Sequence, residues 1–300
     1  MNVFLVKDSV TVQEMVSQST LALSAAGIAQ PRLDAEILLA EIFGGRREDV
    51  YIQSDRVLNA EEVARYAHWI ERRLAREPVA TILGRREFWS LNFKVNSEVL
   101  IPRPETEGVI ERLLALRDES RHRPQPNILD LCTGSGILAV VAAREIPASR
   151  VFAVDISAPA LQVARENAQA HLVADRLVFF EGDLFEGWEA PECRELDFIL
   201  CNPPYIESRL LPQLQPEIRD HEPALALDGG PDGLEFFKRI IPTAAERLRP
   251  GGFIIMEMGP EQAPAVTELM ASQPALENIV VTRDYSGRDR VISARRASLG

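Results

Sequence analysis

A glycine-rich turn at residues 130–136, Asp-Leu-Cys-Thr-Gly-Ser-Gly, decides the fold of this 300-residue chain. It follows a predicted strand and leads directly into a predicted helix over 137–145. Gly134 and Gly136 allow a tight backbone turn and a close approach between the main chain and a ligand. Asp155 ends the next predicted strand, nineteen residues beyond Gly136, where an acidic residue commonly binds ribose hydroxyls. Because the pattern is not Gly-x-Gly-x-x-Gly, the turn favours a nucleoside ligand without a pyrophosphate.

Predicted strands and helices alternate from residue 105 to the end of the chain. The predicted parallel strands are residues 128–131, 151–155, 177–181, 198–201 and 253–257. The predicted helices are residues 105–116, 137–145, 158–170, 233–248 and 261–272. The last two apolar segments, 279–282 and 290–293, flank a short loop with a glycine and predict an antiparallel pair. The pattern predicts an α/β fold, with a mostly parallel, Rossmann-like sheet of seven strands that ends in an antiparallel hairpin.

The first third of the chain predicts a separate helical domain. Its third helix begins at Asn59, with Glu62 three residues later as a capping partner. The predicted helices cover residues 11–26, 31–43 and 59–77, and end before Gly27, Gly44 and Pro78.

Two apolar segments, 88–95 and 99–101, follow the helices and predict a hairpin that links the domains. The chain therefore divides into a helical domain at 1–84, a hairpin linker at 85–103 and the α/β domain at 104–300.

Composition excludes several classes of protein. Hydrophobic residues make up 46% of the chain and charged residues 26%, which is enough for a large core and excludes a disordered chain. No apolar run approaches the length of about 18 residues that a membrane span needs. The first eight residues lack a basic start and a small-residue cleavage site, so we expect no secretory signal.

The charge of the chain is unevenly distributed. The net charge is −12, and residues 87–300 alone contain 22 basic and 33 acidic side chains. An acidic surface repels phosphate backbones, so duplex nucleic acid is a poor candidate for the substrate.

The three cysteines, Cys132, Cys193 and Cys201, are odd in number and lack the spacing of a metal site. We therefore expect neither a disulfide framework nor a metal site. The same pattern indicates a reducing, cytoplasmic location.

A second motif, Asn-Pro-Pro-Tyr at 202–205, follows the predicted strand 198–201. This strand should lie beside the glycine-turn strand, so both loops would meet where ligands bind in such sheets. The lone pair of an amide or aromatic amino nitrogen is delocalised, so such a nitrogen needs acceptors for its hydrogens before it can attack a methyl donor. The side-chain oxygen of Asn202 and the carbonyl of Pro203 can accept them, while the prolines hold both in place. Tyr205 offers a flat face to a planar group. The motif predicts a methyltransferase that modifies an adenine or cytosine amino group or a glutamine amide.

Weaker signals lie elsewhere. Asp183 follows the third strand, where such folds often contact an adenine amino group, and Leu184 could pack on the adenine ring. An Asp that caps a turn and a Leu in the core are the alternatives. Residues 221–233 are rich in turn-forming residues and form a candidate active-site loop. His221 lies in this loop without a partner motif, so we expect it to be solvated or structural rather than catalytic. Neither Cys132 nor Cys201 has an evident base nearby in the sequence, so we expect them to line the cleft without acting as nucleophiles.

The combination of motifs resembles the HemK-type (PrmC) family of glutamine methyltransferases, which modify peptide chain release factors. The matching segments are residues 86–90, 101–107, 130–136, 202–205, 221–233 and 283–285. The resemblance implies a class I S-adenosylmethionine-dependent methyltransferase fold and S-adenosylmethionine as the methyl donor. It implies methylation of the glutamine in the Gly-Gly-Gln motif of release factors during translation termination, and an N-terminal helical domain that helps to dock the factor.

The resemblance also assigns roles. Asn202 and Pro203 would be catalytic, and together with Pro204 and Tyr205 would hold the glutamine. The cofactor-binding residues would be Cys132, Thr133, Gly134, Ser135, Gly136, Asp155, Leu184 and Asn202, to which the position after the third strand adds Asp183.

Several alternatives remain open. The family more often has Gly where Cys132 stands, and Cys there is familiar from the sister family that methylates a glutamine of a ribosomal protein. Segments 101–107 and 283–285 favour the release-factor branch. The acidic charge disfavours an adenine methyltransferase that acts on nucleic acid. The intact motifs disfavour a binding module with a decayed cofactor site. The sequence contains no long heptad repeat that would drive assembly, so we expect a monomer.

Overall fold

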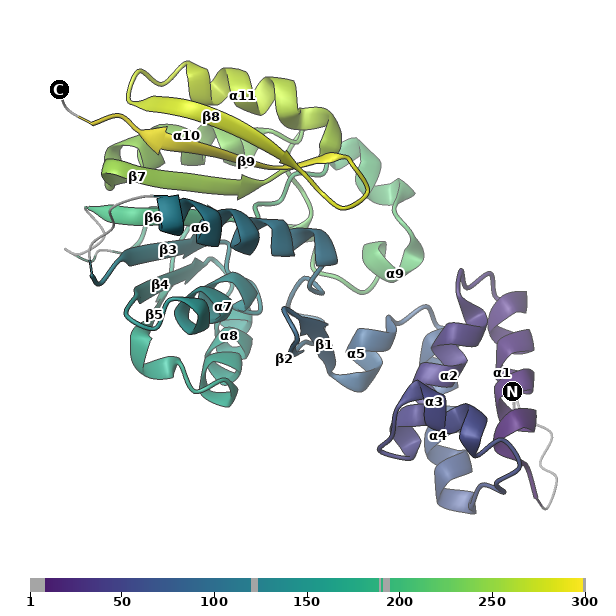
Figure 1. Ribbon diagram of the computed structural model, residues 1–300. Coiled ribbons are helices and arrows are strands. Elements are labelled where there is room, and N and C mark those ends of the chain that lie inside the picture. Colours follow the sequence, from purple (N-terminus) through teal and green to yellow (C-terminus); the bar gives the residue numbers. More distant parts are fainter. Residues whose placement is uncertain (1–8, 120–123, 189, 191–194, 299–300) are drawn as a thin grey trace. The chain divides into compact units, whose positions relative to one another are not determined.

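The computed structural model describes residues 9–119, 124–188, 190 and 195–298. Cys193 and the first eight residues, for which we expect no secretory signal, lie outside these ranges. The chain divides into two compact units, one of residues 1–84 with 215–221, the other of residues 85–214 with 222–300. Figure 1 shows the first as a group of short helices and the second as a sheet flanked by helices.

The helical unit consists of helices, the longest of which begins with a side-chain capping pair. Its elements are α1 (Val12–Ala25), α2 (Pro31–Ile42), α3 (Arg47–Ile52), α4 (Ala60–Leu74), α5 (Val79–Leu83) and α9 (Pro216–Arg219). The predicted capping pair is confirmed: the Glu62 amide donates to the Asn59 side chain at 2.9 Å, and the Glu62 carboxylate accepts from the Asn59 amide at 3.0 Å. Gly27 follows α1 with a φ of 73°, which only glycine adopts without strain.

Two expectations for this unit were wrong. α4 ends at Leu74, before the proline at position 78, because the chain leaves the helix at Ala75 and Arg76 takes a left-handed φ of 71°. The helices α3 and α5, of six and five residues, were not predicted, since so few residues carry no helical periodicity.

Arg73 is the central charge of this unit, and only 5% of it is exposed. Its guanidinium binds Asp34 and Glu217, both at 2.8 Å, and so joins α4 to α2 and to the segment 215–221 that belongs to the same unit. Arg73→Met should lower the free energy of unfolding by about 3 kcal/mol, because the largely buried Asp34 loses the guanidinium that it binds and Glu217 keeps only its ion pair with Arg76. Denaturant unfolding checks this against Arg65→Met, an exposed position on the same helix; equal losses in both variants would contradict it.

The α/β unit contains a seven-stranded sheet in the order β5-β4-β3-β6-β7-β9-β8. Its strands are β3 (Asn127–Leu131), β4 (Arg150–Asp155), β5 (Leu177–Glu181), β6 (Leu196–Cys201), β7 (Leu248–Glu257), β8 (Leu276–Arg283) and β9 (Asp289–Arg296). The first five are parallel, and β9 pairs antiparallel with both β7 and β8. The predicted fold class, the strand set and the terminal antiparallel hairpin are confirmed.

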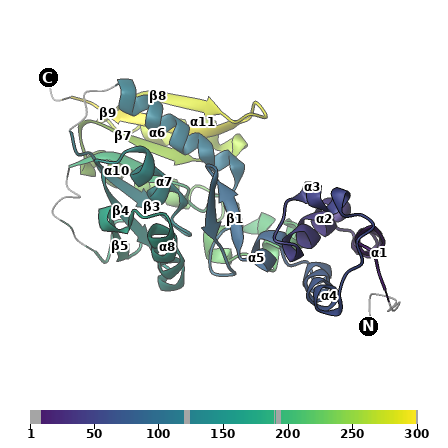
Figure 2. The same ribbon diagram turned by 60° about the horizontal axis from the view of Figure 1, so that its bottom comes forward.

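Helices cover both faces of this sheet (Figure 2). They are α6 (Glu107–Glu119), α7 (Ile137–Glu145), α8 (Ala158–Ala170), α10 (Glu235–Arg247) and α11 (Ala263–Ala271). One apolar cluster joins α6 and α7 to the sheet through Ile128, Phe198 and Phe253, and a second joins α10 and α11 to it through Leu129 and Ile199. Neighbouring residues of β3 thus face opposite layers, as the pleat of a doubly covered sheet requires. No helix within the described ranges is long and apolar enough to cross a membrane.

The linking hairpin differs from the prediction. The observed strands are β1 (Arg85–Phe88) and β2 (Leu91–Lys94), and the chain reverses at Trp89 and Ser90. Both turn residues have a left-handed φ, 53° and 56°, which is usually supplied by Asn-Gly or Gly-Gly and so gave no sequence signal here. The Glu107 carboxylate accepts the Trp89 amide at 2.8 Å and helps to hold this turn. Residues 99–101, predicted as the second strand, form no strand, and Val99 and Leu100 instead line a cavity.

Candidate functional site

The two motif loops lie side by side at the carboxyl ends of β3 and β6. These strands are parallel neighbours, and Leu131 pairs with Cys201 at their ends. The glycine turn and the segment 202–205 therefore both leave the sheet at the point where the strand order changes direction. The predicted adjacency of the two loops is confirmed.

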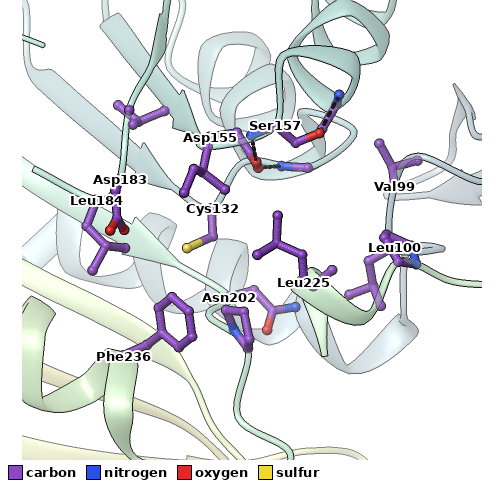
Figure 3. A pocket seen from close by; sticks show the side chains of 18 of the residues that line it. Val99, Leu100, Cys132, Asp155, Ser157, Asp183, Leu184, Asn202, Leu225 and Phe236 are labelled. Atoms are coloured by element: carbon purple, nitrogen blue, oxygen red, sulfur yellow. Dashed lines mark hydrogen bonds between the residues drawn. The ribbon is translucent and has the colours of Figure 1, made fainter. Parts of the chain in front are cut away.

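A cavity of about 400 Å³ opens between these loops. Figure 3 shows Asp155 and Ser157 at one end and Asn202 at the other, with Cys132 between them. Of the predicted site residues, those that line this cavity are Cys132, Gly134, Asp155, Asp183, Leu184, Asn202 and Pro204. Thr133 and Ser135 line a smaller adjoining cavity that also reaches Asn202, whereas Gly136, Pro203 and Tyr205 border neither.

Asp155 holds the glycine turn against the end of β4. Its Oδ2 accepts the Gly134 amide at 2.8 Å, and its Oδ1 accepts the Ser157 amide at 2.9 Å. Burial raises the pKa of this carboxyl, and the backbone amides partly oppose the shift. Each carboxylate oxygen retains a lone pair beyond these bonds, so Asp155 can still accept hydroxyl hydrogens from the cavity.

Gly136 immediately precedes α7 and has no room for a side chain. Its φ is 82°, and a Cβ at this position would lie 3.0 Å from the Ala164 Cβ and 3.2 Å from its Cα. The turn thus needs glycine both for its backbone conformation and for the close packing of α7 on α8.

Asp130 anchors the same turn from inside the protein. It is fully buried, and its Oδ2 accepts the Thr133 hydroxyl at 2.6 Å and the Ala139 amide at 3.1 Å. Its Oδ1 has no hydrogen-bond partner among the described residues. Burial raises the pKa of Asp130 to about 7. Thr133 is therefore committed to the protein, and its hydroxyl serves the shape of the turn.

The buried carboxyl of Asp130 makes stability depend on pH. Between about pH 4 and pH 7 the native state holds a proton that the unfolded chain has released, so stability falls as pH rises. Relative to Asp130→Asn, the wild type should lose about 3 kcal/mol between pH 5 and pH 8. Denaturant unfolding across this range measures the difference, with the exposed Asp175→Asn as control. A difference that stays constant with pH would contradict the shift.

The second motif presents Asn202 to the cavity and turns Tyr205 away. The Asn202 Nδ2 donates to the Thr106 hydroxyl at 3.2 Å, which leaves its Oδ1 without a hydrogen bond from the described residues. The Tyr205 hydroxyl donates to the Glu257 carboxylate at 3.0 Å and is thereby committed to the protein. The predicted packing of the Tyr205 ring on a planar group stays a prediction.

Asp183 and Leu184 both line the cavity, and their contacts with an adenine ring stay predictions. Asp183 lines the cavity, and its carboxylate also binds the Arg239 guanidinium at 2.6 Å. Leu184 lines the cavity, is 6% exposed and packs in the apolar cluster beneath it.

Other lining residues were missed or only partly anticipated. Phe236 and Arg239 come from α10, and nothing in the sequence of an amphipathic helix indicates that its first turns face a ligand. Leu225 lies within the candidate loop 221–233 and lines the cavity, whereas an active-site role of this loop stays a prediction.

Glu222, which belongs to this loop and is 7% exposed, connects the loop to segment 99–103. Its carboxylate accepts the Ile101 amide at 3.0 Å and pairs with Arg103 at 2.5 Å. Segment 99–103 and the loop are thereby held together at the cavity rim. His221, by contrast, hydrogen-bonds the Ala75 carbonyl at 3.0 Å within the helical unit, a structural role as expected.

Comparison with known proteins places this geometry in a family. Residues 14–84 match the PrmC N-terminal domain, and residues 112–215 match the methyltransferase small domain. The release factor glutamine methyltransferase of Bradyrhizobium diazoefficiens is 40% identical over 97% of this chain and 98% of its own length. That of Moorella thermoacetica is 39% identical over 95% of this chain and 99% of its own length.

Solved structures agree on the fold. The catalytic domain of hMettl16, in complex with the MAT2A 3'UTR hairpin 6, aligns with a TM-score of 0.54 at 18% identity. The alignment covers 82% of this chain and 86% of that one. A methyltransferase from Pyrococcus furiosus aligns with a TM-score of 0.50 at 16% identity, over 80% of this chain and all of that one. The glycine turn, the Asn-Pro-Pro-Tyr loop and near full-length identity of about 40% lead to one conclusion: the chain belongs to the release factor glutamine methyltransferase family.

Proposed function

We propose that this enzyme methylates the side-chain amide nitrogen of the glutamine in the Gly-Gly-Gln motif of peptide chain release factors. The methyl donor is S-adenosylmethionine, as expected for a methyltransferase of this family. The observation that carries the proposal is that a single cavity is lined by both Asp155, which can accept ribose hydroxyls, and Asn202, whose oxygen can accept an amide N–H.

The donor site suits S-adenosylmethionine on the chemistry of its residues. We propose that Asp155 accepts hydrogens from the ribose, that Asp183 binds the adenine amino group, and that Leu184 packs on the adenine ring together with Phe236. Residues 132–136 would surround the methionine part of the donor. Asn202 would border both the donor and the acceptor.

The acceptor nitrogen must be oriented rather than deprotonated in advance. When bound, S-adenosylmethionine supplies a methyl group already activated by the positive sulfur. Asn202 Oδ1 and the Pro203 carbonyl would each accept one N–H of the glutamine amide, which turns its lone pair toward the methyl group. Pro204 and Tyr205 would shape the acceptor site. As the amide nitrogen bonds to the methyl carbon, the bond from that carbon to sulfur breaks, and sulfur keeps the electron pair and leaves as a neutral thioether. The nitrogen releases one proton to solvent, and this scheme needs neither a metal nor a covalent intermediate.

The other parts of the chain have proposed roles as well. We propose that the helical domain, residues 1–84, docks the release factor, that residues 85–103 link it to the catalytic domain at 104–300, and that the enzyme is a cytoplasmic monomer. Residues 87–300 carry 22 basic and 33 acidic side chains, which supports a protein substrate over direct binding of nucleic acid.

One assay tests the substrate. The purified enzyme is incubated with methyl-labelled S-adenosylmethionine and either a release factor, the same factor with its Gly-Gly-Gln glutamine replaced, or ribosomal proteins, and mass spectrometry locates the label. Label on the release-factor glutamine, absent in the replaced version, is expected. Label on ribosomal protein alone would move the substrate to that of the sister family, and no label on either protein would contradict the proposal.

A further inference from the structure

The main chain that carries Asn202 leaves β6 as a loop, so contacts outside the sheet must hold it in place. The Asn202 side-chain oxygen and the Pro203 carbonyl each have to meet one hydrogen of the acceptor amide, which requires a fixed backbone. The two prolines restrict their own φ angles, so the loop is stiff between Asn202 and Tyr205. Whatever anchors Tyr205 therefore also determines where Asn202 lies.

The side chain of Gln262 binds the main chain of Tyr205. Gln262 ends the short helical turn η6 (Pro260–Gln262), directly before α11. Its Nε2 donates to the Tyr205 carbonyl at 3.0 Å and to the Gly233 carbonyl at 2.9 Å. Its Oε1 accepts the Gly259 amide at 2.9 Å. All three partners are main-chain groups, two that only accept and one that only donates, so the amide of Gln262 has one favourable direction.

Two glycines make room for this contact. A Cβ at Gly233 would lie 2.6 Å from the Gln262 Nε2 and 2.5 Å from the Tyr205 oxygen. A Cβ at Gly229 would lie 2.6 Å from the Tyr205 Cα. These distances are too short for any side chain, so glycine at both positions is what allows the segments to approach each other so closely. The Gln262 bonds and the close packing of the two loops thus depend on the same positions.

Main-chain hydrogen bonds join the same two loops. The Ile206 amide donates to the Leu227 carbonyl at 3.0 Å, and the Gly229 amide donates to the Ile206 carbonyl at 2.8 Å. The second of these loops brings Leu225 to the cavity. Gln262 therefore holds both the loop that presents the Asn-Pro-Pro-Tyr motif and the loop that adds an apolar lining to the same cavity.

We propose that Gln262 is a positioning residue for methyl transfer. By binding the Tyr205 and Gly233 carbonyls, it sets the position of the Asn202 oxygen relative to the methyl donor. Gln262 is not among the residues that line the two cavities, so it acts through the main chain and not by contact with a reactant. The inference rests on the proposed function, since it concerns the placement of the oxygen that accepts the glutamine N–H.

Gln262→Met tests the role of the hydrogen bonds, because it keeps the length of the side chain and removes all three bonds. It should lower kcat for methylation of the release factor by about 10- to 100-fold, since small displacements of a reacting group cost this much. The KM for the release factor and the Kd for S-adenosylmethionine should stay within about threefold of wild type, because Asp155 lies at the other end of the cavity (Figure 3). Gln169→Met, at an exposed position of α8, is the control.

Gln262→Glu separates positioning from a loss of stability through its pH dependence. The introduced carboxylate faces two carbonyl oxygens, which disfavours its charged form and raises its pKa. Once protonated, it can again donate to one of the two carbonyls. The ratio of the variant kcat to the wild-type kcat should therefore rise by about tenfold between pH 8.5 and pH 6, whereas the ratio for Gln262→Met should stay constant.

Three kinetic outcomes would overturn the proposal. The first is a kcat within twofold of wild type in both variants. The second is a ratio for Gln262→Glu that does not change with pH. The third is a Kd for S-adenosylmethionine that rises as much as kcat falls, which would assign Gln262 to the donor site.

Hydrogen exchange tests the positioning without a substrate. The Ile206 and Gly229 amides should exchange about tenfold faster in Gln262→Met than in the wild type, while amides of β3 and β6 keep their rates. A wild type that fails to methylate the release factor refutes the proposed function, whereas this result tests the positioning by itself. Equal exchange at both amides in the two proteins, or faster exchange throughout the sheet of the variant, would overturn the inference.

Discussion

Asn202→Ala should lower kcat by about a hundredfold to a thousandfold and change the Kd for S-adenosylmethionine by less than about fivefold. Removal of one preorganised hydrogen-bonding group that acts on the reacting atoms typically costs this much in rate. Asn202 lines the cavity, and its oxygen accepts no hydrogen bond from the described residues, so its loss removes an acceptor for the glutamine N–H. Methyl transfer at saturating donor measures kcat, and calorimetry measures donor binding.

The matched control for this prediction is Asn92→Ala, on the exposed side of β2. It removes the same amide from the same unit without touching the cavity, and it should keep the wild-type rate. A rate for Asn202→Ala within threefold of wild type would remove Asn202 from the mechanism. An equal loss of donor binding and turnover would instead make it a binding residue for the cofactor alone.

Asn202 also illustrates how far the sequence leads. The strands before both motifs are short apolar runs followed by glycine, proline or acidic residues, so their positions in the chain could be predicted. Their expected order in the sheet predicted that the two loops lie side by side. The chemistry of an Asn followed by two prolines was equally visible, because it depends on residues adjacent in the chain.

What could not be predicted depends on contacts between residues far apart in the sequence. The hairpin turn at Trp89 and Ser90 takes a left-handed backbone that neither residue favours, and it is held by Glu107 from the next helix. Phe236 and Arg239 face the cavity only because α10 packs beneath the loop after β5. These contacts form only when the sheet and its helices have assembled, so no local sequence pattern predicts them.

The buried carboxyls show the same limit in energetic terms. Asp130 and Glu257 look like ordinary strand residues in the sequence, but both are buried, and burial raises the pKa of each. Burial of a carboxyl group destabilises the fold unless hydrogen bonds compensate for the lost hydration, so buried carboxyls with raised pKa values are often found at functional sites. Both lie directly behind the two motif loops, Asp130 behind the glycine turn and Glu257 behind the Asn-Pro-Pro-Tyr segment.

Asp155→Ala should raise the Kd for S-adenosylmethionine by about a hundredfold, the second large effect that we expect. The substitution removes the acceptor for ribose hydroxyls and also releases the Gly134 and Ser157 amides, so the turn loses its order. Calorimetric titration measures the Kd, and Asp175→Ala, at a position where the side chain is 79% exposed, provides the control. A Kd within threefold of wild type would contradict the assignment.

The remaining activity of Asp155→Ala distinguishes a binding role from a catalytic one. Because Asp155 lies at the end of the cavity away from Asn202, kcat at saturating donor should recover to within about fivefold of the wild-type value. Burial raises the pKa of Asp155, so donor affinity in the wild type should weaken on acidification at a higher pH than an exposed aspartate would allow. The alanine variant should lack this dependence. If it keeps the same acid limb, another group is responsible, and the ribose contact must be sought elsewhere in the cavity.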